Sequence, residues 1–153
     1  METKKRETLK NAGEFLELNT FGIIGVSSNT HKFGNNIFRE LIAKNYKVYQ
    51  IHNLHKILNN HECYSNPVDI PEKIEGLIIS VRKDRVKQII NDYHNQGIEN
   101  FWIQQGSESS EVKEFCKERK IKAVHGKCIL MFAQPVNSIH KVHRTLWNWF
   151  GRS

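Results

Sequence analysis

The stretch TFGIIGVSSNTHKFGNNIF, residues 20–38, decides the fold. It opens on a compact apolar run at residues 20–26, which predicts a buried strand. A polar, turn-prone stretch follows at residues 27–36, and apolar side chains then recur at helical spacing over residues 37–42. Residues 46–51 (YKVYQI) are β-branched and aromatic and predict a second strand. Strand, helix and strand in this order predict a parallel pair joined by a crossover helix.

The same rhythm continues along the chain. Further strands are expected at residues 76–81, 100–104 and 121–124, and helices at residues 85–95 and 110–120. The alternation predicts an α/β fold, a Rossmann-like, doubly wound and mainly parallel sheet of about five strands with flanking helices.

Three segments lie outside this rhythm. Residues 8–18 carry a helical pattern, with Thr8 as the candidate N-cap. The polar stretch at residues 53–75 contains a candidate short edge strand at residues 62–64 and is assigned no chemistry. A basic, amphipathic helix is expected at residues 136–150.

Composition indicates one soluble domain. The chain has 153 residues, 39% hydrophobic and 25% charged, which predicts a single domain over residues 1–153 with its core at about residues 19–131. No apolar run is long enough to cross a bilayer, and residues 1–10 are too polar for a secretory signal. Three widely spaced cysteines without a CxxC pair predict reduced thiols, a cytoplasmic location and no metal site.

The formal net charge of +7 favours an anionic partner. In a doubly wound sheet a ligand binds outside the carboxyl ends of the strands, and residues 25–36 form the first loop there. Gly25 permits close approach to the backbone, Lys32 offers a positive charge, and Gly34 allows a tight turn into the helix, whose free N–H groups attract an anion. The alternative is that these polar residues only cap the helix.

The loop is not a standard nucleotide motif. Its glycines do not have the GxGxxG spacing of dinucleotide-binding proteins, and the chain contains no P-loop. An NAD site places an acidic residue after the second strand, where this chain has His52 and Asn53. Neutral or cationic groups there suit a ribose that carries a phosphate, as in NADP or coenzyme A (CoA).

Five stretches in a fixed order resemble the stand-alone CoA-binding domain proteins, which are similar to the CoA-binding domain of the succinyl-CoA synthetase alpha subunit. The resemblance covers residues 19–131. Its five stretches are IIGVSSNTHKFGN (23–35), NYKVYQIHN (45–53), LIISVRKDRV (77–86), FWIQQGSESSEV (101–112) and AVHGKCILM (123–131).

The resemblance implies a CoA site built from three groups of residues. The first loop would receive the diphosphate, the end of the second strand would approach the adenosine end, and the later loops would close the pocket. In that order, the implied residues are Gly25, Val26, Ser27, Ser28, Lys32, Phe33, Gly34 and Asn35, then His52 and Asn53, then Arg82, Gln104, Gln105 and Gly106. The chain departs from the family at three of these places, with Ile51-His52-Asn53 for Val-Asn-Pro, no proline near Arg82, and Gln104-Gln105-Gly106 for Gln-Pro-Gly.

The favoured function is therefore a non-catalytic CoA- or acyl-CoA-binding module or regulator, since the phosphorylated histidine of the related synthetase lies on a segment that this chain does not contain. An NADP-dependent oxidoreductase or other nucleotide-using enzyme is an alternative in the same pocket. A partner or nucleic acid bound through the basic tail is a second alternative, with nucleic acid disfavoured because the charges are scattered. A homodimer remains open. No catalytic constellation is evident, and Cys128 fits a packed cysteine better than a thiol that pairs with CoA.

Overall fold

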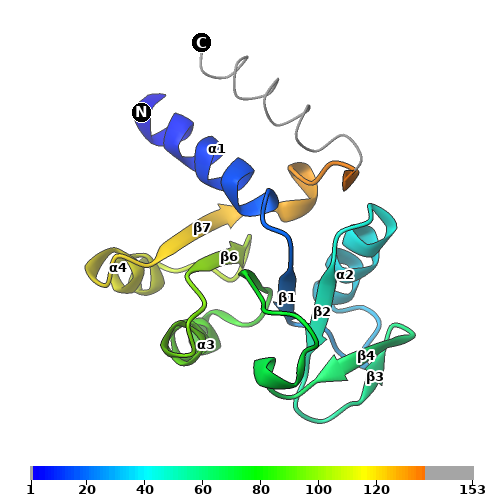
Figure 1. Ribbon diagram of the computed structural model, residues 1–153. Coiled ribbons are helices and arrows are strands. Elements are labelled where there is room, and N and C mark those ends of the chain that lie inside the picture. Colours follow the sequence, from blue (N-terminus) through cyan, green and yellow to red (C-terminus); the bar gives the residue numbers. More distant parts are fainter. Residues whose placement is uncertain (1, 137–153) are drawn as a thin grey trace.

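The computed structural model describes residues 2–136. Within them the strands form one seven-stranded sheet in the order β3-β4-β2-β1-β5-β6-β7, and every neighbouring pair is parallel except β3 with β4 (Figure 1). The helices are α1 (Glu2–Leu16), α2 (Phe33–Ala43), α3 (Lys83–Asn95) and α4 (Ser110–Glu118), with short 3-10 turns η1 (Pro67–Asp69) and η2 (Ile129–Met131). The strands are β1 (Phe21–Ile24), β2 (Val48–Ile51), β3 (Ile57–Leu58), β4 (His61–Tyr64), β5 (Gly76–Ile79), β6 (Asn100–Gln104) and β7 (Lys122–Lys127).

The helices cover the sheet on both faces, α1 and α2 on one and α3 and α4 on the other (Figure 1). Alternate residues of each buried strand divide between the two layers: Ile78 packs toward α1 and α2, whereas its neighbours Leu77 and Ile79 pack toward α3 and α4. All three are fully buried. This two-sided burial explains why the inner strands are continuous apolar runs.

Trp102 on β6 anchors the layer under α1. Its ring is fully buried, lies 5.5 Å from the ring of Phe15 and 5.8 Å from that of Phe132, and its Nε1 donates to the carbonyl of Lys127 at 3.0 Å. The polar end of the indole is thus satisfied inside the core. Because Phe15 lies on α1 and Phe132 follows η2, the tryptophan joins the two ends of the described chain to the sheet.

The α/β, doubly wound architecture expected from the sequence is confirmed, and all five expected parallel strands are present. The polar stretch at residues 53–75 adds a hairpin, so the sheet reaches seven strands, and β4 lies inside the sheet next to β2 with β3 as the edge. Residues 62–64 therefore form a strand as expected, but the prediction that this strand lies at the edge was wrong.

The cap at Thr8 was also wrong. Helix α1 begins at Glu2, and Thr8 lies inside it with its hydroxyl donating to the carbonyl of Lys4 at 2.9 Å. Residues 2–7 are exposed and polar, and their helical conformation follows from the helix propensity of Lys, Arg and Glu. Because these residues show no apolar periodicity, the sequence pattern did not reveal this part of the helix. The helix expected at residues 136–150 falls, apart from Val136, outside the described residues. Among those residues, no helix combines the length and apolar character needed to span a membrane.

Candidate functional site

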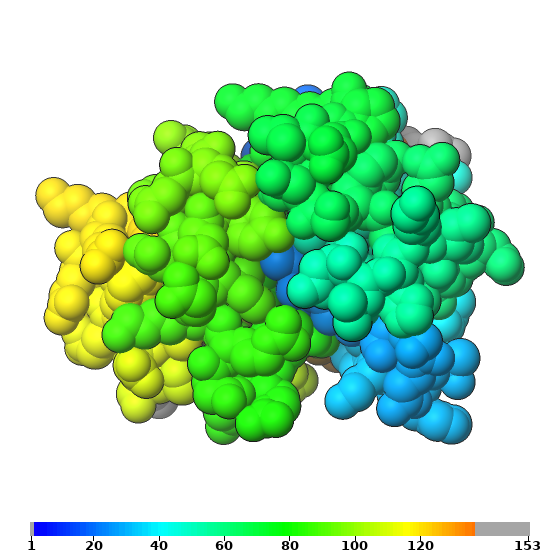
Figure 2. Space-filling model, turned by 90° about the horizontal axis from the view of Figure 1, so that it is seen from below, coloured from blue at the N-terminus to red at the C-terminus, as the bar shows by residue number. Residues whose placement is uncertain are grey.

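The carboxyl ends of β2, β1, β5 and β6 lie side by side at one edge of the sheet. The chain leaves β1 toward β2 on one side and later returns to β5 on the other, so the strand order reverses at β1. Ligands of doubly wound sheets bind at such a reversal. Figure 2 shows this region as a notch in the surface, with the light-blue atoms of the segment after β1 on one side and the green atoms of the segment after β5 on the other.

Two glycines bring the backbone together at this point. A Cβ on Gly34, at the start of α2, would lie 2.2 Å from the carbonyl oxygen of Gly25, and a Cβ on Gly25 would lie 2.2 Å from that of Ser80 after β5. Gly25 also has a φ of +133°, a conformation that L side chains rarely adopt. The end of β1, the first turn of α2 and the segment after β5 therefore meet with no room for a side chain between them.

Helix α2 begins without a side-chain cap, and the N–H of Asn35 in its first turn donates to the carbonyl of Lys32 at 3.1 Å. The N-cap residue is Lys32, which supplies no side-chain cap, and the first turn contains no acidic residue. Helix α3 also lacks a side-chain cap, at Arg82, but carries Asp84 in its first turn, and α4 is capped by Ser109, whose side chain accepts from Val112. Because the first N–H groups of a helix have no partner within it and carry a partial positive charge, α2 presents the most favourable anion position of the three.

The β1–α2 loop, residues 25–32, is held by one buried amide. Asn35 is 1% exposed. Its Oδ1 accepts from the N–H of Ser27 at 3.0 Å, and its Nδ2 donates to the carbonyls of Ser27 at 3.0 Å and Asn29 at 2.9 Å. The start of the helix thus holds the loop at Ser27 and Asn29, and residues 28–32 remain exposed.

A second group of amides continues this network under the hairpin. The side chain of Asn59, in the turn between β3 and β4, donates to Asn35 Oδ1 at 3.1 Å and to Gln50 Oε1 at 2.8 Å. Gln50 is fully buried, and its Nε2 donates to the carbonyl of Leu58 at 2.7 Å. The hairpin is therefore linked by side chains both to β2 and to the start of α2.

His52 follows β2 with a constrained ring. Its Nδ1 accepts from the N–H groups of Leu54 at 3.1 Å and His55 at 3.2 Å, which leaves Nε2 as the protonated nitrogen of the neutral ring. Burial lowers the pKa of His52, and the nearby positive charges of His55 and Arg85 lower it further. The lowered pKa favours the neutral imidazole, whose N–H donor is fixed in orientation.

The loops after β5 and β6 are joined to each other. The hydroxyl of Ser107, which is 4% exposed, donates to the carbonyl of Val81 at 2.6 Å and accepts from its N–H at 3.1 Å. The N–H of Gly106 donates to the carboxylate of Glu108 at 2.6 Å. The N–H groups of Glu108 itself and of Gly106, with Lys83 and Lys113 nearby, lower the pKa of that carboxyl. The carboxylate of Glu108 thus already occupies an anion position beside the loop after β6.

The residues expected at the site all lie at this edge, but they differ in access. Ser28, Lys32, Phe33, Asn53, Arg82, Gln105 and Gly106 are exposed, whereas Gly25, Ser27 and His52 are partly buried. Val26, Gly34, Asn35 and Gln104 are buried. Val26 packs in the core, and Gln104 accepts from the N–H of Ile129 at 3.1 Å, so these side chains face inward. Arg82 is paired with Asp84 at 3.1 Å.

The sequence reasoning missed the supporting residues Gln50, Asn59 and Ser107. A signal for the turn was available, since Asn59 and Asn60 are adjacent and both adopt the left-handed backbone that tight hairpin turns require, with φ of 52° and 60°. The partners of the Asn59 side chain could not be inferred, because Asn35 lies 24 residues away and Gln50, nine residues away, is brought near only by the hairpin.

Other chemistry-bearing groups lie apart from the α2 start. His125, within β7, has its Nδ1 buried without a hydrogen-bond partner among residues 2–136, and burial together with Lys113 lowers its pKa to about 4, against a smaller opposing effect of Glu108. Cys63, Cys116 and Cys128 are free, and no group of three potential metal ligands occurs within the described part of the chain. Burial raises the pKa of the Cys116 thiol to about 11.

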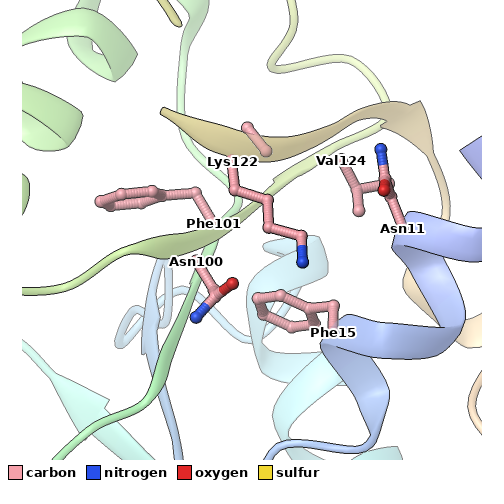
Figure 3. Close-up of a pocket in the computed structure, with 7 residues that line it drawn as sticks. Asn11, Phe15, Asn100, Phe101, Lys122 and Val124 are labelled. Carbon is pink, nitrogen blue, oxygen red and sulfur yellow. The ribbon is translucent and has the colours of Figure 1, made fainter. Parts of the chain in front are cut away.

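A shallow hollow lies at the opposite edge of the sheet, between α1 and the beginnings of β6 and β7 (Figure 3). It is lined by Asn11, Phe15, Asn100, Phe101, Lys122, Ala123 and Val124. The ammonium group of Lys122 donates to Glu14 at 2.6 Å, so the charge at the rim of the hollow is neutralised. The hollow offers no unpaired charge for a ligand.

Comparison with known proteins identifies the family. A family model described as a CoA binding domain matches residues 19–134, three quarters of the chain. The chain belongs to the CoA-binding domain family. The match spans the whole sheet and includes the β1–α2 loop, the hairpin and the loops after β5 and β6.

Solved structures share the fold of this CoA-binding-domain protein. A conserved hypothetical protein from Pyrococcus furiosus superposes with a TM-score of 0.70 at 22% identity, over 76% of this chain and 100% of that one. A protein from Thermus thermophilus gives a TM-score of 0.61 at 16% identity, over 94% and 98% of the two chains. An acetyl-coenzyme A synthetase from Candidatus Korarchaeum cryptofilum, in complex with phosphate and ADP, gives 0.58 at 24% identity, over 69% of this chain and 25% of the larger one.

Proposed function

We propose that this protein binds coenzyme A at the carboxyl edge of β1, with the diphosphate on the uncapped N-terminus of α2, and that it acts as a binding module without a catalytic step of its own. The observation that carries the proposal is the uncapped start of α2 at Lys32, placed at the strand-order reversal of a CoA-binding domain. Family membership supports CoA as the ligand, and the acetyl-coenzyme A synthetase with the same fold is a consistent neighbour.

The local geometry fits a diphosphate. Because Gly25 and Gly34 have no Cβ, the first turn of α2 packs directly against the backbone at the end of β1, at the edge where the ligand is expected. The N–H groups of the first turn of α2 would donate to the phosphate oxygens, and the Lys32 ammonium group would add a full positive charge. Ser28 is exposed between them and offers a hydroxyl donor.

Charge at the same edge favours a ligand with several phosphates. The loops at residues 25–32, 52–56, 80–82 and 105–109 carry Lys32, Lys56 and Arg82 against the carboxylate of Glu108, histidines aside, and Arg82 is also paired with Asp84. The Nε2–H of His52 lies after β2, where an adenosine ribose is bound in doubly wound folds, and it can donate to a ribose phosphate. CoA carries such a phosphate at the 3′ position of its ribose.

NADP is the second candidate, because the same absence of an acidic residue after β2 suits a 2′-phosphate. Isothermal titration calorimetry with CoA, acetyl-CoA, dephospho-CoA and NADP separates the ligands. The proposal predicts binding of CoA, and weaker binding of dephospho-CoA, which lacks the ribose phosphate. Binding of NADP without CoA would favour the oxidoreductase, and a folded protein that binds none of the four at millimolar concentration contradicts the proposal.

The substitution Lys32→Glu tests the position of the diphosphate. Charge-assisted hydrogen bonds contribute about 1.5–3 kcal/mol each, so the variant is expected to bind CoA roughly 10- to 100-fold more weakly than wild type. Lys5→Glu makes the same change of charge on an exposed residue of α1 and serves as the matched control. Equal weakening in both variants would mean that net charge alone, and not the start of α2, attracts the ligand.

A further inference from the structure

We propose that Asn59, in the turn of the β3–β4 hairpin, is a positioning residue that sets the geometry of the β1–α2 loop and thereby its affinity for a diphosphate. The proposal rests on the function proposed above for that loop. Asn59 lies in the polar stretch at residues 53–75, to which the sequence pattern assigns no chemistry. It is connected to the loop through the side chain of Asn35.

The connection is a short chain of hydrogen bonds. The Nδ2 of Asn59 donates to Asn35 Oδ1 at 3.1 Å, and the same oxygen accepts from the N–H of Ser27 at 3.0 Å. Asn59 is therefore two hydrogen bonds away from the loop backbone, although it lies 32 residues further along the sequence than Ser27. A shift of the hairpin turn moves the acceptor on which Ser27 depends.

The donor and acceptor roles in this network are fixed. Asn35 Nδ2 is used by the carbonyls of Ser27 and Asn29, and Gln50 Nε2 by the carbonyl of Leu58, so both residues present oxygen to Asn59. Asn59 must offer an NH2 group to both oxygens at once. Since Asn35 is 1% and Gln50 0% exposed, water has little access to replace it, and the loss of the donor removes the Asn59 bond of Gln50 Oε1 and leaves the N–H of Ser27 as the donor to Asn35 Oδ1.

The oxygen of Asn59 is used as well. Arg39 on α2 donates from Nη1 to Asn59 Oδ1 at 2.9 Å, and from Nη2 to Asn36. The turn is thus attached to α2 from two sides, through the buried amides and through an exposed arginine. This arrangement holds the first turn of α2, the proposed anion position, at a set distance from the hairpin.

The backbone of the turn permits a clean test. Asn59 and Asn60 both have a left-handed backbone, with φ of 52° and 60°, which glycine adopts without strain. Asn59→Gly therefore removes the side chain and preserves the turn. Asn60→Gly makes the same change at the neighbouring exposed residue and is the matched control. Asn59→Asp keeps the shape of the side chain but replaces the donor with an acceptor.

The first measurement is amide hydrogen exchange by NMR on the full chain, read at Ser27 and, for reference, at Phe101 in the core strand β6. Relative to Asn60→Gly, the Asn59→Gly variant is expected to exchange about tenfold faster at Ser27, with Phe101 unchanged. Asn59→Asp is expected to have at least as large an effect, because a carboxylate faces the oxygens of Asn35 and Gln50. Wild-type exchange at Ser27 in Asn59→Asp, or equal acceleration at Ser27 and Phe101, overturns the positioning role.

The second measurement is calorimetric titration of the same variants with CoA and with inorganic pyrophosphate. Asn59→Gly is expected to weaken the binding of both about five- to tenfold relative to Asn60→Gly, because the loop donors lose their alignment. Faster exchange at Ser27 with unchanged affinity overturns the link to binding. If wild type binds neither compound, the proposed function fails, whereas the exchange at Ser27 still decides whether Asn59 holds the loop.

Discussion

Replacing Gly34 by alanine tests the close contact between β1 and α2. The new Cβ would lie 2.2 Å from the carbonyl oxygen of Gly25, whereas heavy atoms in contact lie about 3.5 Å apart, so the start of α2 must move outward by about 1 Å. Such overpacking costs about 1–3 kcal/mol. Alanine returns about 1 kcal/mol in helix propensity, which leaves a net loss of about 0–2 kcal/mol. For a domain of this size a loss of about 2 kcal/mol corresponds to a melting temperature lower by about 4–8 °C.

The control for this variant is Gly97→Ala. Gly97 has a φ of 100° and no atom within 4 Å of its Cβ position, so alanine there incurs a conformational cost of about 1–2 kcal/mol without a clash. Thermal melts by circular dichroism should therefore show similar losses of stability in both variants. CoA titrations should separate them, with weaker binding in Gly34→Ala alone. A Gly34→Ala protein with wild-type melting temperature and affinity would refute the close approach of Gly34 to Gly25.

Two further predictions concern histidines. Burial lowers the pKa of His125 to about 4, so below about pH 6.5 the unfolded chain binds a proton that the folded chain does not. The free energy of unfolding therefore falls from about pH 6.5 down to about pH 4. Urea unfolding at pH 7 and pH 4.5 should show a larger loss of stability in wild type than in His125→Asn. Arg85 contributes to the lowered pKa of His52, so Arg85→Ala should raise that pKa toward its ordinary value. An NMR titration of the imidazole protons measures the change, and an unchanged midpoint would argue against the proximity of Arg85 and His52.

The central strands could be predicted because burial on both faces leaves a plain apolar signature. Ile23, Ile78 and Phe101 are each at most 1% exposed. The β3–β4 hairpin left no such signature, since Ile57 is 67% exposed and the residues of β4 are exposed or only partly buried. Leu58 is the buried apolar side chain of its strands, which are otherwise held by pairing and by the side chain of Gln50, and such contacts are not visible as a period in the sequence.

The candidate site was predictable in place but not in detail. The loop at Gly25–Lys32 follows from the strand-helix order, because the carboxyl ends of parallel strands meet at one edge. Residue type alone could not tell that Asn35 and Gln104 turn inward whereas Lys32 and Gln105 remain exposed, since an amide can bind a ligand or a backbone group equally well. That difference depends on partners such as Ser27 and Ile129, which only the folded chain brings near.

The central position of β1 also governs how the chain is completed during synthesis. Phe21 pairs with Val48 on one side, 27 residues later, and with Gly76 on the other, 55 residues later. At roughly 5–20 residues per second, the ribosome needs about 3–11 s to deliver the second partner after β1 has been made. During those seconds one edge of an apolar strand stays unpaired. The nascent chain therefore exposes an apolar strand edge that the finished protein covers.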